Sequence, residues 1–281
     1  MKIGIIGYGF VGSALHNALK KNVKVFLVDP KLQSSINDLN AFNPSIVFVC
    51  VPTPMSDDGT QDISILDNVI KEIISLEINP LIAIKSTILP DVLDYLKLQL
   101  TNVVYNPEFL REKHANEDFI KSNLIVLGGK ANDVDELDNF YKEHTICECK
   151  EYIKTDLITA SFIKYTINTF LATKITFFNE LKNIFDISNA DDSWENFTNY
   201  LKKDTRIGSS HMSVPGHDGK LGFGGACLPK DSRALLEYAR KHGAELSILN
   251  EAINVNNNIR RRYNIEQRES DQNINFLNKN K

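Results

Sequence analysis

The chain has 281 residues, of which 42% are hydrophobic and 24% charged, and its formal net charge is −4 at pH 7. This composition is typical of a globular protein and argues against a disordered chain, and the mild negative charge gives no reason to expect a nucleic-acid partner. At this length two domains are expected, because a single hydrophobic core usually stops growing below it.

Membrane segments and disulfides are not expected either. The longest apolar stretches, residues 45–51 and 81–84, have the length of strands and are far shorter than the roughly 20 residues of a membrane span. The N-terminal apolar run contains glycines where a signal sequence needs continuous apolar residues, so we expect a cytoplasmic protein. The cysteines form neither a disulfide framework nor a paired metal-binding spacing, and we expect reduced thiols. They are Cys50, Cys147, Cys149 and Cys227.

The first half of the chain alternates β-branched apolar runs with amphipathic segments, which is typical of parallel strands joined by crossover helices. The predicted strands are residues 2–6, 23–28, 46–51, 81–85, 103–105 and 124–127. The predicted helices are residues 11–20, 63–76, 92–100 and 133–144. We therefore predict an α/β fold in which residues 1–150 form a Rossmann-type, doubly wound parallel sheet.

From Asp156 onward the periodicity becomes helical, and Thr155 or Asp156 offers an N-cap. The predicted helices are residues 156–185, 192–202, 231–242 and 245–263, with a Gly-rich loop at 206–229. We predict an α-helical central domain over residues 151–264. Residues 265–281 have little apolar content, and we expect them to form a polar tail that frays.

A dinucleotide-binding fingerprint follows the first predicted strand. The loop Gly7-Tyr8-Gly9-Phe10-Val11-Gly12 opens a helix, and Asp29 ends the second strand at the expected spacing. Gly7 permits a tight turn, Gly9 lets the backbone approach a pyrophosphate, and Gly12 allows close helix packing. A carboxylate at Asp29 would accept from ribose hydroxyls and repel a 2′-phosphate, which favours NAD over NADP. A glycine turn in a cofactor-free protein is the alternative, but strand, helix and Asp29 together argue against it.

A second glycine-rich loop, residues 222–231, places Cys227 just before a predicted helix that has Asp231 near its N-terminus. A helix N-terminus and the neighbouring Lys230 favour an ionised thiol. A structural cysteine is the alternative, but the segment is too rich in glycine to be core. Cys50 lies in an apolar strand and is predicted to be a small core residue, and Cys147 and Cys149 are predicted to be inert.

Several motifs in one order resemble the UDP-glucose/GDP-mannose dehydrogenase family from Met1 to about Arg262. They are the Gly7–Gly12 loop, Val51-Pro52-Thr53-Pro54, Lys85-Ser86-Thr87, Asn106-Pro107-Glu108-Phe109-Leu110-Arg111-Glu112, Lys164-Tyr165-Thr166-Ile167-Asn168, Asp204-Thr205-Arg206-Ile207-Gly208 and the Gly222–Asp231 loop. The resemblance implies an enzyme that removes two hydrides from a sugar C6 with two NAD molecules, through a thiohemiacetal and a thioester on Cys227. UDP-glucose is the expected substrate, and GDP-mannose and UDP-N-acetylmannosamine stay open.

The resemblance also implies roles for individual side chains. Lys164 and Asn168 are four residues apart on a predicted helix, so both can direct donors at a developing oxyanion. Glu108 looks like the general base or the carboxylate that positions water, and Glu112, expected one helical turn later, looks like a nicotinamide-side contact. A solvated lysine, an incidental asparagine and exposed acidic surface are the alternatives.

Asp231 and Thr87 resemble a pair that holds a catalytic water, although Thr87 could simply end its strand. Pro52 and Thr53 follow a parallel strand at the edge where such sheets bind ligands, and an ordinary turn is the alternative. The expected cofactor contacts are Gly7, Tyr8, Gly9, Phe10, Val11, Gly12, Asp29, Pro52, Thr53, Thr87, Glu112 and Lys230. The expected substrate contacts are Glu108, Phe109, Leu110, Arg111, Lys164, Asn168, Arg206, Phe223 and Gly224.

No metal site is predicted, because His211, His217 and Asp218 lack ligand spacing, and Arg260-Arg261-Arg262 reads as a solvated helix end. We expect a homodimer through the central helix, motivated by the predicted helix at residues 245–263, and by resemblance Arg206 reaches a neighbouring subunit's substrate site. Full-length relatives carry a further nucleotide-binding domain, so weak binding of the sugar nucleotide and a separate chain that supplies this domain are expected. A catalytically impaired NAD-binding partner and an unrelated hydroxyacid dehydrogenase are the competing hypotheses.

Overall fold

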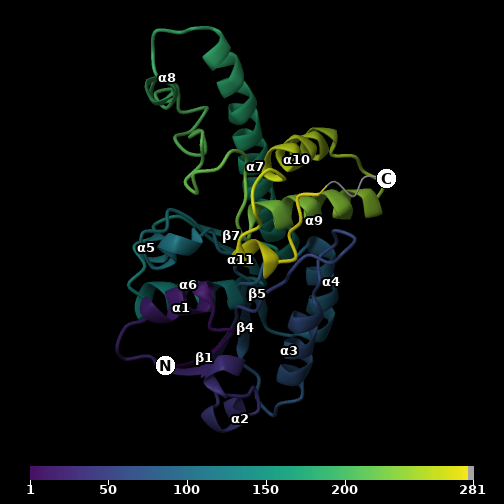
Figure 1. The fold of residues 1–281 in the computed structure, drawn as a ribbon. Coiled ribbons are helices and arrows are strands. Elements are labelled where there is room, and N and C mark those ends of the chain that lie inside the picture. The colour runs from purple at the N-terminus through teal and green to yellow at the C-terminus, as the bar shows by residue number, and fades with distance from the viewer. Residues whose placement is uncertain (278–281) are drawn as a thin grey trace. The chain divides into compact units, whose positions relative to one another are not determined.

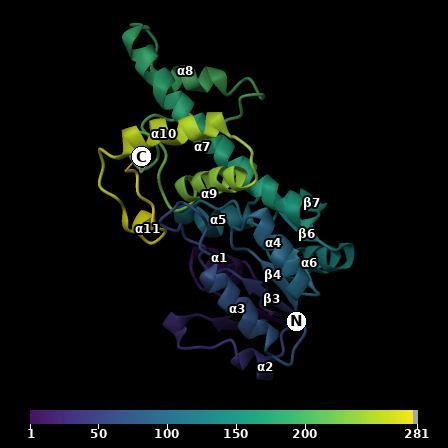
Figure 2. The same cartoon turned by 90° about the vertical axis from the view of Figure 1, so that its right-hand side faces the viewer.

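The computed structural model describes residues 1–277 and divides the chain into two compact units. The first unit comprises residues 1–53 and 61–164, and the second comprises residues 54–60 and the chain from 165 onward. Figure 1 and Figure 2 show the elements of both units from two directions. In the described part of the chain no helix is long and apolar enough to cross a membrane.

A seven-stranded sheet forms the centre of the first unit, in the order β2-β1-β3-β4-β5-β6-β7. Neighbouring strands are parallel except for the antiparallel pair of β5 and β6. The strands are β1 (Lys2–Ile6), β2 (Lys24–Val28), β3 (Ile46–Val49), β4 (Leu81–Ile84), β5 (Val103–Tyr105), β6 (Ile125–Gly129) and β7 (Tyr152–Thr155). The predicted Rossmann-type sheet is confirmed, but a purely parallel sheet is wrong at β5 and β6.

Helices cover both faces of this sheet, which makes it doubly wound. Figure 1 shows α3 and α4 on one side and α1 and α6 on the other. Strand β3 shows why, since Val47 and Val49 pack into the core on the α3 side while Ile46 and Phe48 pack into the core with α1 and α6. The helices of this unit are α1 (Phe10–Asn17), α2 (Asp38–Phe42), α3 (Ser64–Ile74), α4 (Pro90–Gln99), α5 (Ala115–Ile120) and α6 (Ala131–His144).

Three elements of the first unit were absent from the predicted set. Helices α2 and α5 have only five and six residues, too few for a helical period to show. Strand β7 has half-exposed and exposed residues at the sheet edge and therefore lacks an apolar run. Because β7 pairs with β6, the sheet continues past residue 150, and the first unit extends to Lys164.

The second unit is helical, as predicted for the central domain. Its long helix α7 begins in the first unit and continues into the second. The helices are α7 (Leu157–Ile187), α8 (Trp194–Leu201), α9 (Leu228–Lys241), α10 (Ser247–Arg260) and α11 (Gln267–Ser270). The expectation of a frayed tail is wrong up to residue 277, because α11 has a capping box and Ile274 and Phe276 are buried.

Backbone segments approach each other closely at the turn between β1 and α1. Gly7 has a φ of +91°, and a β-carbon there would lie 2.7 Å from the Cys50 carbonyl oxygen. A β-carbon at Gly12 would overlap the Gly7 carbonyl oxygen, whereas one at Gly9 would meet no atom within 4 Å. The turn therefore requires glycine at Gly7 and Gly12 for packing, while Gly9 faces open space.

This contrast gives a test of the fold. Gly12→Ala should lower the free energy of unfolding by about 1–3 kcal/mol, because α1 must shift away from the turn. Gly9→Ala, three residues earlier in the same loop, should change it by less than about 0.5 kcal/mol. Urea denaturation of both variants measures the difference, and equal stabilities would contradict the close packing of α1.

Candidate active site

The loop between β1 and α1 leaves room for an anion at the helix N-terminus. Gly9 is the N-cap of α1, and within residues 1–277 a β-carbon on it would meet no atom within 4 Å. Phe10 and Val11 begin the helix behind it. The loop lies at the carboxyl end of β1, next to β3, where the strand order reverses and doubly wound sheets bind their ligands. These residues therefore fit the pyrophosphate of a dinucleotide.

Asp29 follows β2 at the same edge of the sheet. Its carboxylate accepts from the Tyr8 backbone N–H at 2.7 Å and from the Lys31 N–H at 2.9 Å. These bonds fix the carboxylate beside the glycine loop. An acceptor in this place can take hydrogen bonds from a ribose diol, as the sequence predicts.

Thr53 and Thr87 lie together beyond β3 and β4. The buried Thr53 hydroxyl donates to the Thr87 carbonyl at 2.7 Å, and Gln61 donates to the same oxygen at 2.8 Å. Pro52 is exposed beside them. The Thr87 backbone is thus held at this edge of the sheet, Thr87 is half-buried, and its role in a catalytic site stays a prediction.

Lys164 and Glu108 form a buried ion pair in the first unit. Lys164, on α7, is 2% exposed, and Glu108 is 7% exposed. The Lys164 ammonium lies 3.4 Å from a Glu108 carboxylate oxygen and also donates to the Glu108 carbonyl. The Phe109 ring lies 5.1 Å below the ammonium. The hydrogen bonds of such a buried pair fix the direction of both side chains.

The expected helix over Glu108 and Glu112 is wrong. Glu108 accepts from the Leu110 backbone N–H at 2.6 Å, a local bond that replaces helical hydrogen bonding. Glu112 begins a short 3-10 helix and is exposed, so the two carboxylates do not share a helical face. Arg111 is exposed and binds both oxygens of Asp118, which leaves its expected substrate contact untested.

A buried lysine supports the Asn-Pro-Glu segment from below. Lys85 donates to the Asn106 side chain at 3.0 Å and lies 3.3 Å from the Tyr141 hydroxyl. Burial lowers the pKa of Lys85, and it raises the pKa of the Cys50 thiol to about 12 despite the nearby Lys85 charge. The raised pKa favours the protonated thiol, and Cys50 packs against the apolar core, in agreement with its prediction as a small core residue.

Cys227 is the N-cap of α9 in the second unit. Asp231, in the first turn of this helix, is fully buried and accepts from Lys230 at 2.6 Å and from the Asn168 amide at 2.6 Å. The structure thus brings together Asn168, Lys230 and Asp231, and places Cys227 one turn before Asp231. By contrast, burial raises the pKa values of Cys147 and Cys149, which agrees with their predicted inertness.

Lys164 and Asn168 lie one turn apart on α7, as their spacing predicts. They belong to different units, as do Thr87 and Asp231, so a water held by the latter pair stays a prediction. Arg206 is exposed and pairs with Asp204 at 2.6 Å, and its reach to a second subunit stays a prediction as well.

The side chains that hold the second glycine-rich loop, residues 222–231, were not predicted from the sequence. Asn256, on α10, accepts from the Phe223 N–H at 2.7 Å and donates to its carbonyl at 3.0 Å. Asn179 accepts from the Gly222 N–H at 2.9 Å. Arg260 is 1% exposed, so its interpretation as a solvated helix end is wrong. Asn256 and Arg260 lie one helical turn apart and so share a face of α10, but this spacing does not show that the face is buried.

Phe223 is buried, and a β-carbon at Gly224 would overlap the Arg260 guanidinium. Within residues 1–277 no group of three or more His, Cys, Asp and Glu side chains could hold a metal ion. The organisation of the loop therefore depends on hydrogen bonds and on one arginine.

Comparison with known proteins places this geometry in a family. The NAD binding domain of the UDP-glucose/GDP-mannose dehydrogenase family matches residues 32–145, and the central domain of that family matches residues 158–258. UDP-glucose 6-dehydrogenase of Rickettsia bellii is 39% identical over 223 residues, which cover 76% of this chain and 49% of that protein. UDP-glucose 6-dehydrogenase AglM of Haloferax volcanii is 28% identical, with 91% of this chain and 69% of that protein covered.

A UDP-glucose dehydrogenase structure from Pyrobaculum islandicum superposes with a TM-score of 0.73 at 25% identity, and covers 91% of this chain and 67% of that one. The chain spans about half the length of Rickettsia relatives that it matches. The two domain matches follow one another in the family's order, and the central-domain match includes the cysteine loop at residues 222–231. The chain therefore belongs to the UDP-glucose/GDP-mannose dehydrogenase family, and its cofactor is NAD.

Proposed function

We propose that this protein oxidises the C6 alcohol of a nucleotide sugar to the carboxylate, with UDP-glucose as substrate and Cys227 as the covalent nucleophile. The observation that carries the proposal is Cys227 at the N-cap of α9, one turn before the buried Asp231 that Lys230 and Asn168 hold. A helix N-terminus stabilises a thiolate, and the thiolate is the nucleophilic form of cysteine.

Each side chain has a task in this reaction. Cys227 adds to the aldehyde-level carbon to form a thiohemiacetal, and loss of hydride converts it into a thioester that water hydrolyses. Two hydrides leave in each turnover, one when the C6 alcohol becomes the aldehyde and one when the thiohemiacetal becomes the thioester, and two NAD molecules bound in succession would accept them. Asp231 handles the proton of the attacking thiol or water, and Asn168 fixes the direction of its carboxylate.

The buried Lys164 and Glu108 serve the charge that develops on the sugar oxygen. An ammonium that is already desolvated and paired stabilises an oxyanion without reorganisation of water. Glu108 directs this ammonium and positions the hydrolytic water in turn. Phe109, Leu110 and Gly224 supply uncharged contacts to the substrate.

The substrate choice rests on the name of the family and of relatives such as the Rickettsia bellii enzyme. GDP-mannose and UDP-N-acetylmannosamine are the alternatives. The test is to incubate the chain with NAD and each sugar nucleotide in turn while NADH absorbance is followed. The substrate should yield two equivalents of NADH per sugar oxidised. A hydroxyacid dehydrogenase would reduce NAD with hydroxyacids instead, and a catalytically impaired partner subunit would not reduce NAD with any of these compounds.

We also propose a homodimer formed through α7. Phe170, Phe177 and Ile184 are spaced by seven residues on this helix and are 62%, 58% and 64% exposed. Three large apolar side chains on one face of a helix mark a surface that another protein surface covers.

The first prediction of the proposed function concerns the nucleophile. Cys227→Ser should abolish carboxylate formation, because an alcohol is a poor substitute for a thiolate at neutral pH. Cys147→Ser is the matched control, since its thiol donates to the Phe119 carbonyl at 3.2 Å and a hydroxyl can replace it. Carboxylate formation by Cys227→Ser at the wild-type rate, measured by chromatography, would contradict the covalent mechanism.

The choice of cofactor gives a second prediction. NAD should bind more tightly than NADP. Asp29→Asn should lower the ratio of the NADP dissociation constant to the NAD dissociation constant by about tenfold to a hundredfold, which is the equivalent of one charge-assisted hydrogen bond. Asp38→Asn, which removes an exposed carboxylate bound to Ser35, should leave the ratio unchanged. Titration calorimetry that finds equal affinities in the unmodified protein would refute the role of Asp29.

The dimer can be tested on the α7 face. Phe177→Glu should raise the dimer dissociation constant at least about tenfold, because it removes a buried ring and forces a charge into the interface. Leu98→Glu, an 82% exposed apolar residue on α4, is the control and should leave association unchanged. Sedimentation velocity distinguishes the two, and a wild-type monomer at micromolar concentration would end the proposal.

A further inference from the structure

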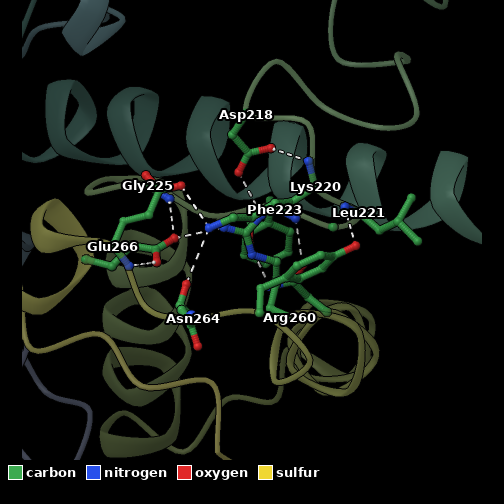
Figure 3. Close-up of polar contacts among 12 residues, drawn as sticks. Asp218, Lys220, Leu221, Phe223, Gly225, Arg260, Asn264 and Glu266 are labelled. Carbon is green, nitrogen blue, oxygen red and sulfur yellow. Dashed lines mark hydrogen bonds and ion pairs between the residues drawn. The ribbon is translucent and has the colours of Figure 1, made fainter.

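The C-terminal segment, residues 264–277, is bound to the loop that leads into Cys227. Figure 3 shows its polar contacts with the loop residues Lys220 and Gly225 and with Arg260 of α10, which in turn bonds to Asp218 of the loop. The contacts come from side chains in and before α11, and every residue involved belongs to the second unit. This segment is therefore part of the packed structure around the cysteine loop.

Glu269 is the centre of these contacts and is 0% exposed. One carboxylate oxygen accepts from the Gly225 backbone N–H at 2.9 Å and from the Arg260 guanidinium at 2.9 Å. The other oxygen accepts from the Glu266 backbone N–H at 2.9 Å in the capping box of α11. One side chain thus joins the C-terminal segment, α10 and the backbone two residues before Cys227.

The glycines of the loop allow this approach. A β-carbon at Gly224 would overlap the Arg260 guanidinium and would lie 2.5 Å from the Glu269 carboxylate. A β-carbon at Gly222 would lie 2.5 Å from the Asn256 side-chain oxygen. The glycine-rich sequence therefore brings the backbone against buried polar side chains.

Arg260 carries the charge balance of the network. Its second terminal nitrogen donates to Asp218 at 2.8 Å, and its guanidinium stacks on the Phe276 ring at 5.4 Å. Burial alone would raise the pKa of Asp218, but the bonds from Arg260 and from the Lys220 backbone lower it, so the carboxylate is ionised. Two carboxylates thus bind the two terminal nitrogens of one buried guanidinium.

A second salt-bridge layer closes the network at its rim. Glu266 accepts from Lys220 at 2.9 Å and from Arg268 at 2.7 Å, and Lys220 also reaches the Asn264 carbonyl at 3.3 Å. These partners are more exposed than Arg260 and Glu269 and add less stability. The buried carboxylate of Glu269 is thus the contact that fixes the loop backbone.

We propose that Glu269 is a positioning residue for Cys227: by accepting the Gly225 N–H and pairing with Arg260, it fixes the loop so that Cys227 caps α9 in its reactive geometry. The proposal rests on the proposed function for the meaning of "reactive". The hydrogen bond itself and its effect on the thiol can be measured without any substrate.

The test compares Glu269→Gln with Asp271→Asn. The first keeps the size of the side chain but removes the charge that pairs with Arg260, and the second removes a charge from the adjoining turn, where Gln267 is the bonded side chain. Hydrogen exchange of the peptide over residues 222–228 should accelerate at least about tenfold in Glu269→Gln, because the Gly225 N–H loses a charged acceptor. Peptides from α7 and the sheet should exchange as in the unmodified protein.

The second readout is alkylation of Cys227 by iodoacetamide, followed by mass spectrometry across pH. In Glu269→Gln the pH midpoint should rise by about one unit, because the thiol leaves the helix N-terminus. A change in access alone would scale the rate at every pH and leave the midpoint in place. Lys230 and Asp231, the charged groups of the same first turn, are unchanged in both variants.

Glu269→Asp covers the case in which Glu269→Gln does not fold. It keeps the charge beside Arg260 but shortens the side chain by one methylene, and it should show the same two changes at smaller size. A folded variant with wild-type exchange and midpoint would overturn the proposal, as would equal changes in Asp271→Asn. With UDP-glucose, kcat should fall while the NAD dissociation constant stays constant. Turnover of GDP-mannose or UDP-N-acetylmannosamine but not of UDP-glucose by the unmodified protein would refute the proposed substrate and leave the two substrate-free readouts intact.

Discussion

In both glycine-rich loops, residues 7–12 and 222–231, the backbone approaches other backbone atoms or buried side chains more closely than a β-carbon would permit. The residues proposed for cofactor binding and for the reaction depend on this close approach. In the first unit Gly12 packs against the Gly7 carbonyl, which sets the start of α1 directly behind the turn. In the second unit Gly222 and Gly224 admit the Asn256 amide and the Arg260 guanidinium. The same residue type thus serves an open anion site in one unit and a filled polar network in the other.

Local sequence signals predicted the fold well where the period was long. The strands around the glycine turn, the helices of the sheet faces and the long α7 all follow from apolar periodicity. What failed was short or governed by tertiary contacts. The antiparallel orientation of β6 and the edge strand β7 depend on neighbouring strands of the sheet. The segment at Glu108 is not helical because the Glu108 carboxylate accepts from the Leu110 backbone N–H.

The candidate site divides in the same way. The motif predicted Cys227 just before a helix with Asp231 near its N-terminus, as α9 has it, but it did not predict the buried pairing of Lys164 with Glu108. No local pattern could assign Arg260 to the interior or join Glu269 to Gly225, since those partners are separated by 44 positions in the case of Glu269. A polar C-terminal segment such as residues 264–277 is predicted to be solvent-exposed unless the buried charge with which it pairs, here that of Arg260, is known.

Buried ion pairs recur in the described structure, as Lys164 with Glu108, Lys230 with Asp231, and Arg260 with Asp218 and Glu269. Desolvation of the charges offsets most of their attraction, so such pairs add little net stability compared with apolar side chains of similar volume. Their hydrogen bonds are directional, however, and loss of one partner leaves a buried charge uncompensated. Each pair therefore admits few alternative arrangements of the backbone it touches. Because these pairs lie at the Asn-Pro-Glu segment, at the first turn of α9 and at the loop before Cys227, they specify geometry at the residues proposed for the reaction, and the apolar cores supply the stability that permits it.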